Sequence, residues 1–105
     1  MLDVKITVLK RLCIQELIDD YGAKDISYCD THKEGDVFIS KGGRRPSGFC
    51  VEAWSAFEKY VFALAHGAEG FWKTWINQDG IAINSCNDGL RPVIFKLEVI
   101  NEEQD

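Results

Sequence analysis

The chain has 105 residues, of which 46% are hydrophobic, and its formal net charge is −5 at pH 7. This length and apolar content predict one globular domain, while the negative charge argues against nucleic acid as a partner, because a phosphate backbone would be repelled. No apolar run approaches the roughly 20 residues that span a bilayer, and the first residues lack the pattern of a signal peptide. We therefore expect no membrane partner and a cytoplasmic location.

The first third of the chain predicts a strand, a short helix and a second strand. Apolar and polar residues alternate over 2–8, which is typical of a strand with one buried face. Apolar residues then recur at helical spacing over 14–21, and Gly22 is expected to end this helix as its C′ residue. A polar loop over 23–36 leads into a short strand at 37–39.

Residues 47–64 hold the longest helical pattern of the chain. Five large or apolar side chains at spacings of four, three, four and three share one face: Cys50, Trp54, Phe57, Val61 and Leu64. We expect Ser47 to cap the helix, because Pro46 disfavours helical backbone at the residue before it. Gly67 is expected to end the helix in the left-handed conformation.

The last third of the chain predicts a β-hairpin. Residues 81–86 and 92–100 are typical of strands, and 87–89 between them form a turn signal. The segment 71–76 is too short to assign beyond a single helical turn, and the acidic tail at 101–105 is expected to be frayed.

The expected element order is therefore close to β-α-β-β-α-β-β. Strands grouped with two helices predict an α+β fold, in which both helices pack on a small antiparallel or mixed sheet as a two-layer sandwich. This single domain is expected to cover residues 1–100.

Several segments resemble a family of short, uncharacterised prokaryotic proteins of similar length. The most specific match is the closing segment at 86–96, which reads Cys-Asn-Asp-Gly-Leu-Arg-Pro-Val-Ile-Phe-Lys. The other matching segments are 4–9, 35–38, 46–50 with 53–54, and 60–64. The resemblance spans nearly the whole chain and implies membership of that family, but it assigns no residue a chemical role.

The cysteines and one histidine carry the clearest chemical hypothesis. Cys29 and His32 have the C-x2-H spacing that lets two side chains reach one ion from a loop. Cys50 and Cys86 lie at the ends of expected elements, where loops gather, and would complete a Cys3His site. Such a site would hold zinc, which favours thiolate sulfur and imidazole nitrogen in a tetrahedron.

Two other interpretations of the cysteines stay open. A free cysteine behaves as a small hydrophobe, so Cys50 and Cys86 are also explained by packing alone, and Cys13 is best explained in that way. Alternatively, Cys50 is a reactive thiol, because the start of a helix and the nearby Arg44 and Arg45 favour the thiolate. Burial of Cys50 against the helix face would oppose that effect.

A basic loop at 41–47 supports a rival hypothesis. It runs toward the expected start of a helix, where free N–H groups and cationic side chains bind phosphate or carboxylate. The expected anion-binding residues are Lys41, Arg44, Arg45, Ser47 and Arg91. The simpler alternative is a solvated loop whose charges keep it in water.

Together these patterns predict a small cytoplasmic binding or accessory protein with a cysteine and histidine site for metal binding or thiol redox chemistry. The alternative is a ligand-binding or enzymatic domain that captures a small anionic molecule at 41–47. Aromatic residues make up 11% of the chain, and any that are exposed would mark a homodimer face or a pocket for a flat ligand, of which we expect the homodimer. The aromatic residues in question are Trp54, Phe57, Phe71, Trp72 and Trp75.

Overall fold

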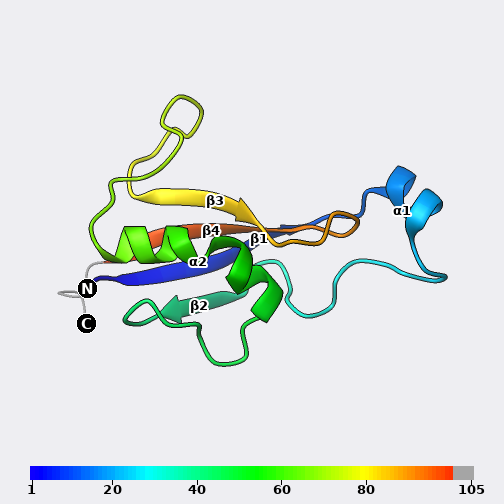
Figure 1. Ribbon diagram of the computed structural model, residues 1–105, viewed down its shortest axis with the longest axis horizontal. Helices are drawn as coiled ribbons and strands as arrows, with labels where there is room; N and C mark the ends of the chain where they lie inside the picture. The colour runs from blue at the N-terminus through cyan, green and yellow to red at the C-terminus, as the bar shows by residue number, and fades with distance from the viewer. Residues whose placement is uncertain (101–105) are drawn as a thin grey trace.

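A computed structural model gives the structure of residues 1–100, and the tail at 101–105 lies outside the described residues. The elements are β1 (Asp3–Arg11), α1 (Gln15–Tyr21), β2 (Val37–Ser40), α2 (Val51–Ala65), β3 (Ile81–Ser85) and β4 (Val93–Ile100). They form an α+β fold of two layers, as predicted (Figure 1). The described residues form four strands, at the four segments expected to be strands, which is one fewer than the expected element order contains.

The four strands form one antiparallel sheet in the order β2-β1-β4-β3. Alternation along β1 places Val4, Ile6 and Val8 on the face toward the core, where each is at most 1% exposed. Across the pairing with β4, Ile6 lies opposite Leu97 and Val8 opposite Phe95. The predicted hairpin is confirmed, since β3 and β4 pair in an antiparallel register.

Helix α2 lies across one face of this sheet and supplies the second layer (Figure 1). Its predicted apolar stripe is confirmed: Phe57, Val61 and Leu64 are fully buried against the sheet. The helix ends as expected at Gly67, which has φ +97°. Gly67 N–H donates to the Leu64 carbonyl and Ala68 N–H to the Ala63 carbonyl, the paired bonds of a Schellman motif.

The start of α2 differs from the prediction. Ser47 does not cap it, because the helix begins at Val51 and Cys50 is the N-cap residue, without a side-chain capping bond. Before that point the chain turns at Gly48, which has φ +78°, and the Phe49 N–H donates to the Pro46 carbonyl at 3.1 Å. This turn directs the Phe49 ring into the core, where it is 2% exposed, so burial of the ring sets the start of the helix.

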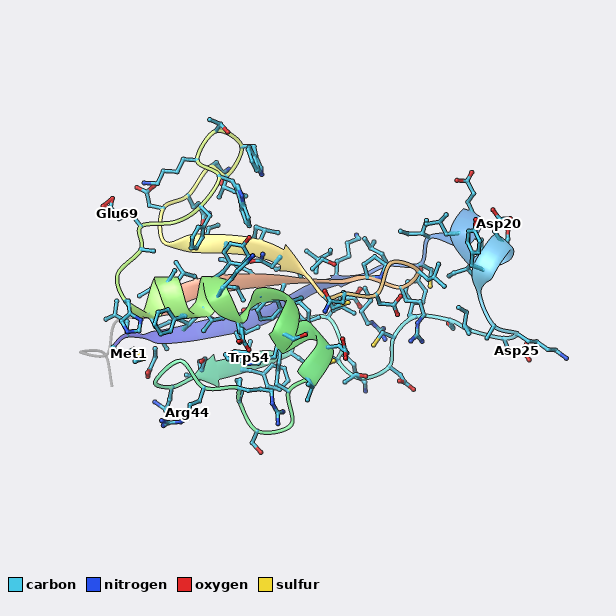
Figure 2. All side chains as sticks on the ribbon, in the orientation of Figure 1. Met1, Asp20, Asp25, Arg44, Trp54 and Glu69 are labelled. Carbon is cyan, nitrogen blue, oxygen red and sulfur yellow. The ribbon has the colours of Figure 1, made fainter. Side chains whose placement is uncertain are left out.

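Helix α1 follows β1 directly at one end of the sheet, and Figure 2 shows Asp20 and Asp25 there, far from Trp54 on α2. Gly22 follows α1 as predicted, and its backbone is extended, with φ −75°. A Cβ at Gly22 would lie 2.7 Å from the Ile18 carbonyl oxygen, so close packing is what requires glycine there. Neither α1 nor α2 is long and apolar enough to cross a membrane.

Candidate functional site

A cavity of about 290 Å³ lies where the loop at 22–36, the start of α2 and the β3–β4 turn meet. Three of the four cysteines contribute to its lining: Cys29 from the loop, Cys50 from the N-cap of α2, and Cys86 directly after β3. Its other lining residues are polar or charged: Thr31, Glu52, Asn87, Asp88 and Arg91. We call this space the cysteine cavity.

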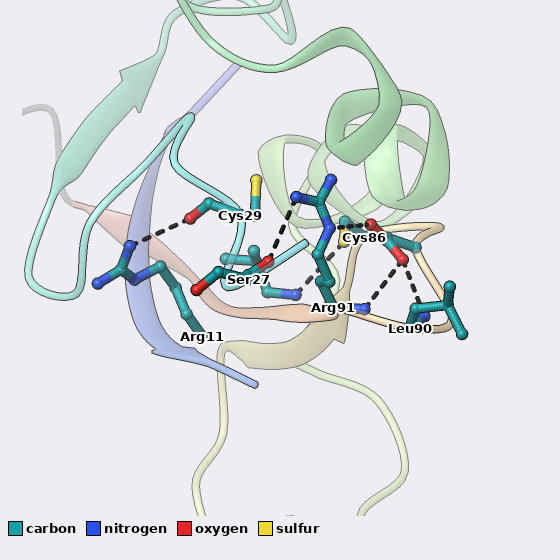
Figure 3. Close-up of polar contacts among 8 residues, drawn as sticks. Arg11, Ser27, Cys29, Cys86, Leu90 and Arg91 are labelled. Atoms are coloured by element: carbon teal, nitrogen blue, oxygen red, sulfur yellow. Dashed lines mark hydrogen bonds and ion pairs between the residues drawn. The ribbon is translucent and has the colours of Figure 1, made fainter. Parts of the chain in front are cut away.

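Cys86 is held in place by the backbone of the β3–β4 turn. Its N–H donates to the Val93 carbonyl at 3.0 Å, and the Val93 N–H donates back to the Cys86 Sγ at 3.3 Å. The sulfur therefore accepts a hydrogen bond from a fixed donor at the wall of the cavity (Figure 3).

Asp88 shapes the same turn and carries the negative charge nearest to Arg91. Its carboxylate accepts the N–H groups of Leu90 at 2.8 Å and Arg91 at 2.9 Å, and it pairs with Arg91 Nε at 3.2 Å. Burial alone would raise the pKa of the Asp88 carboxyl, but these donors favour the charged form and lower the pKa below its usual value. The ion pair therefore sets the position of Arg91 at the cavity.

Two arginines donate hydrogen bonds to the irregular segment that contains Cys29 (Figure 3). Arg11 on β1 donates from Nη1 to the Cys29 carbonyl at 3.1 Å, and Arg91 donates to the Ser27 carbonyl at 3.4 Å. The Arg11 N–H also donates to Glu34 at 2.9 Å, which lowers the pKa of that carboxyl. These contacts hold Cys29 at the cavity although no helix or strand contains it.

His32, the fourth predicted metal ligand, has a structural position. Only 5% of it is exposed, and its ring lies 4.9 Å from the ring of Phe38 and 5.0 Å from that of Phe49. Its Nε2 accepts the Cys50 N–H at 3.1 Å, which satisfies a backbone donor at the start of α2. Burial lowers the pKa of His32, outweighing the Asp36 charge and the Thr31 backbone, which act in the opposite direction.

The predicted Cys3His set is thus assembled only in part. Cys29, Cys50 and Cys86 line one cavity, while His32 turns its Nε2 to the backbone of Cys50. Among residues 1–100, no group of three or more histidine, cysteine, aspartate or glutamate side chains is arranged to hold a metal ion. The C-x2-H spacing therefore does not act as a ligand pair in this arrangement, because the imidazole nitrogen serves the helix start instead.

The residues predicted to bind an anion are placed in different surroundings. Lys41 pairs with Asp3 at 3.0 Å, and Arg45 donates to the Phe49 carbonyl at 2.7 Å. Arg91 lines the cysteine cavity, whose lining includes no residue of 41–47. Because α2 begins at Val51, the loop also does not run directly into the helix as expected.

Of the polar residues that line the cysteine cavity, only Arg91 was predicted as a site residue, for anion binding. Thr31 and Glu52 showed no pattern of their own, and Asn87 and Asp88 were recognised only as part of a turn. The usable signal was Asp88 three residues before Arg91, a spacing that suits an ion pair across a turn.

No protein-family model, no curated protein and no solved structure matches this chain. The resemblance to a prokaryotic family accordingly stays a prediction.

Proposed function

We propose that this chain is a small binding or accessory protein whose cysteine cavity exchanges thiols with small disulfides. The observation that carries the proposal is the position of Cys29, Cys50 and Cys86, which come from three separate segments and line one cavity. All three are free thiols with partial exposure, so a small reagent can reach the cavity that they line.

Packing alone is the competing explanation, since the same three cysteines also contact the hydrophobic core. Two features favour chemistry. The cavity brings polar side chains and the Arg91 guanidinium to the thiols, whereas a packing site needs only apolar neighbours. In addition, the Cys86 sulfur accepts the Val93 N–H at 3.3 Å, which fixes its position at the wall of the cavity.

The proposed reaction has two steps, both ordinary thiol–disulfide exchange. A cysteine thiolate attacks one sulfur of a small disulfide such as glutathione disulfide, which forms a mixed disulfide and releases one glutathione thiolate. A second cysteine thiolate then attacks the protein sulfur of that mixed disulfide and releases the second glutathione. The protein loses two electrons and two thiol protons, and the disulfide is reduced to two thiols that take up those protons.

Glutathione disulfide treatment followed by intact-protein mass spectrometry tests this proposal. We expect the native chain to lose two hydrogen masses, and a Cys13→Ser variant to do the same, because Cys13 lies before α1 and does not line the cavity. Variants that keep only one cavity cysteine, made in the Cys13→Ser chain, should stop at a single glutathione adduct. Oxidation that requires Cys13, or a native chain that stays fully reduced, would contradict the proposal.

The three cavity cysteines are free thiols. Glutathione and thioredoxin systems keep cysteines in this reduced state in the cytoplasm. We therefore propose a cytoplasmic location, in which the cavity would be reduced again after each exchange.

We also propose that the protein forms a homodimer through the sheet face opposite α2. Strand alternation places Val37, Ile39, Ile83 and Ile94 on that face, and the loop at 67–80 lies against it at Ile83. Light scattering should give twice the 11.9 kDa mass of one chain, and Val37→Lys should halve that mass. Val51→Lys, at a more exposed valine on α2, should leave it unchanged; a single-chain mass for the native protein at every concentration would exclude the dimer.

A further inference from the structure

The loop at 67–80 projects beyond β3 and keeps one tryptophan in solvent (Figure 1). Trp75 is 70% exposed, although a tryptophan is among the side chains whose burial stabilises a fold most. The two other tryptophans of the chain are half-buried against the core. The exposure of Trp75 is therefore a feature that the packing of this domain does not explain.

The loop holds Trp75 in a defined position. The Trp75 ring stacks on that of Trp72 at 6.1 Å with an angle of 17° between the planes, and Trp72 in turn contacts Tyr60 on α2 at 5.1 Å. The N–H groups of Trp75 and Ile76 both donate to the Trp72 carbonyl at 2.9 Å, which forms one tight turn. Trp72 adopts φ +53°, a backbone conformation that costs free energy in a residue other than glycine.

Ion pairs close the foot of the same loop. Lys73 pairs with Asp79 at 3.5 Å and with Glu69 at 3.9 Å, and Figure 2 labels Glu69 where the loop leaves α2. The Gly80 N–H donates to the Glu69 carbonyl. A loop restrained in this way presents an already ordered indole, which reduces the entropy that a ligand must overcome on binding.

A cavity of about 340 Å³ lies beside this indole, between the loop and the sheet. Its apolar wall consists of Trp75, Ile76, Ile81 and Ile83. Its polar groups are the Asn77 and Gln78 amides and the Lys96 ammonium, which lies 3.5 Å from Glu98. Neither amide has a hydrogen-bond partner within residues 1–100, so both can bond to a ligand.

The chemistry of these groups selects among ligand classes. A purely apolar ligand would leave both amides and the lysine without partners, and a charged ligand gains little where Lys96 and Glu98 already balance each other. Amide groups each donate and accept hydrogen bonds, as sugar hydroxyls do. The electron-rich indole face also attracts the weakly positive C–H groups on the face of a sugar ring. We propose that the cavity beside Trp75 binds the pyranose ring of a neutral saccharide.

The test is a titration of the native protein with maltotriose, cellotriose and N-acetylglucosamine trimer, followed by the indole N–H signals in ¹H–¹⁵N NMR spectra. We expect at least one of the three to shift the Trp75 signal in a saturable way. Trp75→Ala should then weaken binding at least about tenfold, with Trp75→Phe weaker than native but stronger than Trp75→Ala. Gln78→Leu should also weaken binding, because it removes the amide and keeps the stacking surface.

Tyr21→Ala is the matched control, since Tyr21 is 78% exposed on α1 and far from the cavity along the chain. Circular dichroism should show all variants folded, because each replaced side chain is mostly in solvent. The proposal is overturned if none of the three saccharides gives a saturable shift, or if Trp75→Ala binds as tightly as the native chain. The saccharide proposal is also overturned if the native chain responds to no saccharide and Trp75→Ala has the mass of a single chain. That result would assign Trp75 to the contact between two copies of the chain.

Discussion

Replacing Phe49 with alanine is expected to lower the free energy of unfolding by about 3–5 kcal/mol, the range for deletion of a buried phenylalanine. The ring is 2% exposed and connects the irregular loop, α2 and the sheet. Five rings have their centroids within 6.4 Å of the Phe49 ring centroid: His32, Phe38, Trp54, Phe57 and Phe95. Loss of the ring would leave a cavity, and these five side chains would have to shift to fill it.

Urea denaturation followed by circular dichroism measures this effect. Phe62→Ala is the matched control, because Phe62 is 58% exposed on the outer face of α2 and should change stability by no more than about 0.5 kcal/mol. Equal losses from the two substitutions would show that Phe49 is not the centre of the aromatic core. If Phe49→Ala does not fold, Phe49→Leu takes its place in the measurement. For Phe49→Leu we expect a smaller decrease in the free energy of unfolding.

The stability of the protein is expected to fall with decreasing pH below 6.5 because of His32. Burial lowers the pKa of this imidazole in the folded state below the 6.5 of an exposed histidine. Between these two pKa values the unfolded chain binds more protons than the folded one, so stability increases with pH. The contribution of neutral His32 is therefore complete above pH 6.5 and is lost as the pH falls toward the lowered pKa.

The local reason is the hydrogen bond at the start of α2. Nε2 of neutral His32 accepts the Cys50 N–H at 3.1 Å. In a protonated ring both nitrogens are donors, so the Nε2–H group would point at the Cys50 N–H and the hydrogen bond would be lost. The slope of stability against pH is limited to about 1.4 kcal/mol per unit for one proton. Thermal unfolding at several pH values measures it; His32→Gln should remove the slope, and His66→Gln, at an exposed site, should retain it. An unchanged slope in His32→Gln would contradict the role assigned to His32.

Local patterns predicted those parts of the fold that depend on neighbouring residues. The alternation in β1, the hairpin of β3 and β4 and the buried stripe of α2 follow from periodicity, which one segment of sequence carries by itself. Gly67 was predicted with its conformation, because the Schellman motif requires only the last turn of a helix and the residues that follow.

The main error arises where a distant residue determines local structure. Ser47 satisfies the sequence rules for an N-cap, but the Phe49 ring enters the aromatic core and places the start of α2 three residues beyond Gly48. The contact of Phe49 with Phe95 joins segments far apart in the chain and has no signature in the sequence around Ser47.

The site shows the same division between local and distant causes. Cys29, Cys50 and Cys86 line one cavity, because the ends of their elements gather there. His32 was grouped with them by spacing from Cys29, but its surroundings of Phe38, Phe49 and the Cys50 N–H depend on the folded chain. A buried histidine in an aromatic setting cannot be distinguished from a metal ligand by spacing alone.

Binding of phenylarsine oxide measures most directly whether three thiols distant in sequence act together, because trivalent arsenic binds stably only where two sulfurs can reach it at once. We expect one arsenic per chain for the native protein and for Cys13→Ser, and no stable binding once both Cys29 and Cys86 are replaced by serine. A native chain that binds no arsenic, or a stoichiometry that depends on Cys13, would contradict the shared cysteine cavity.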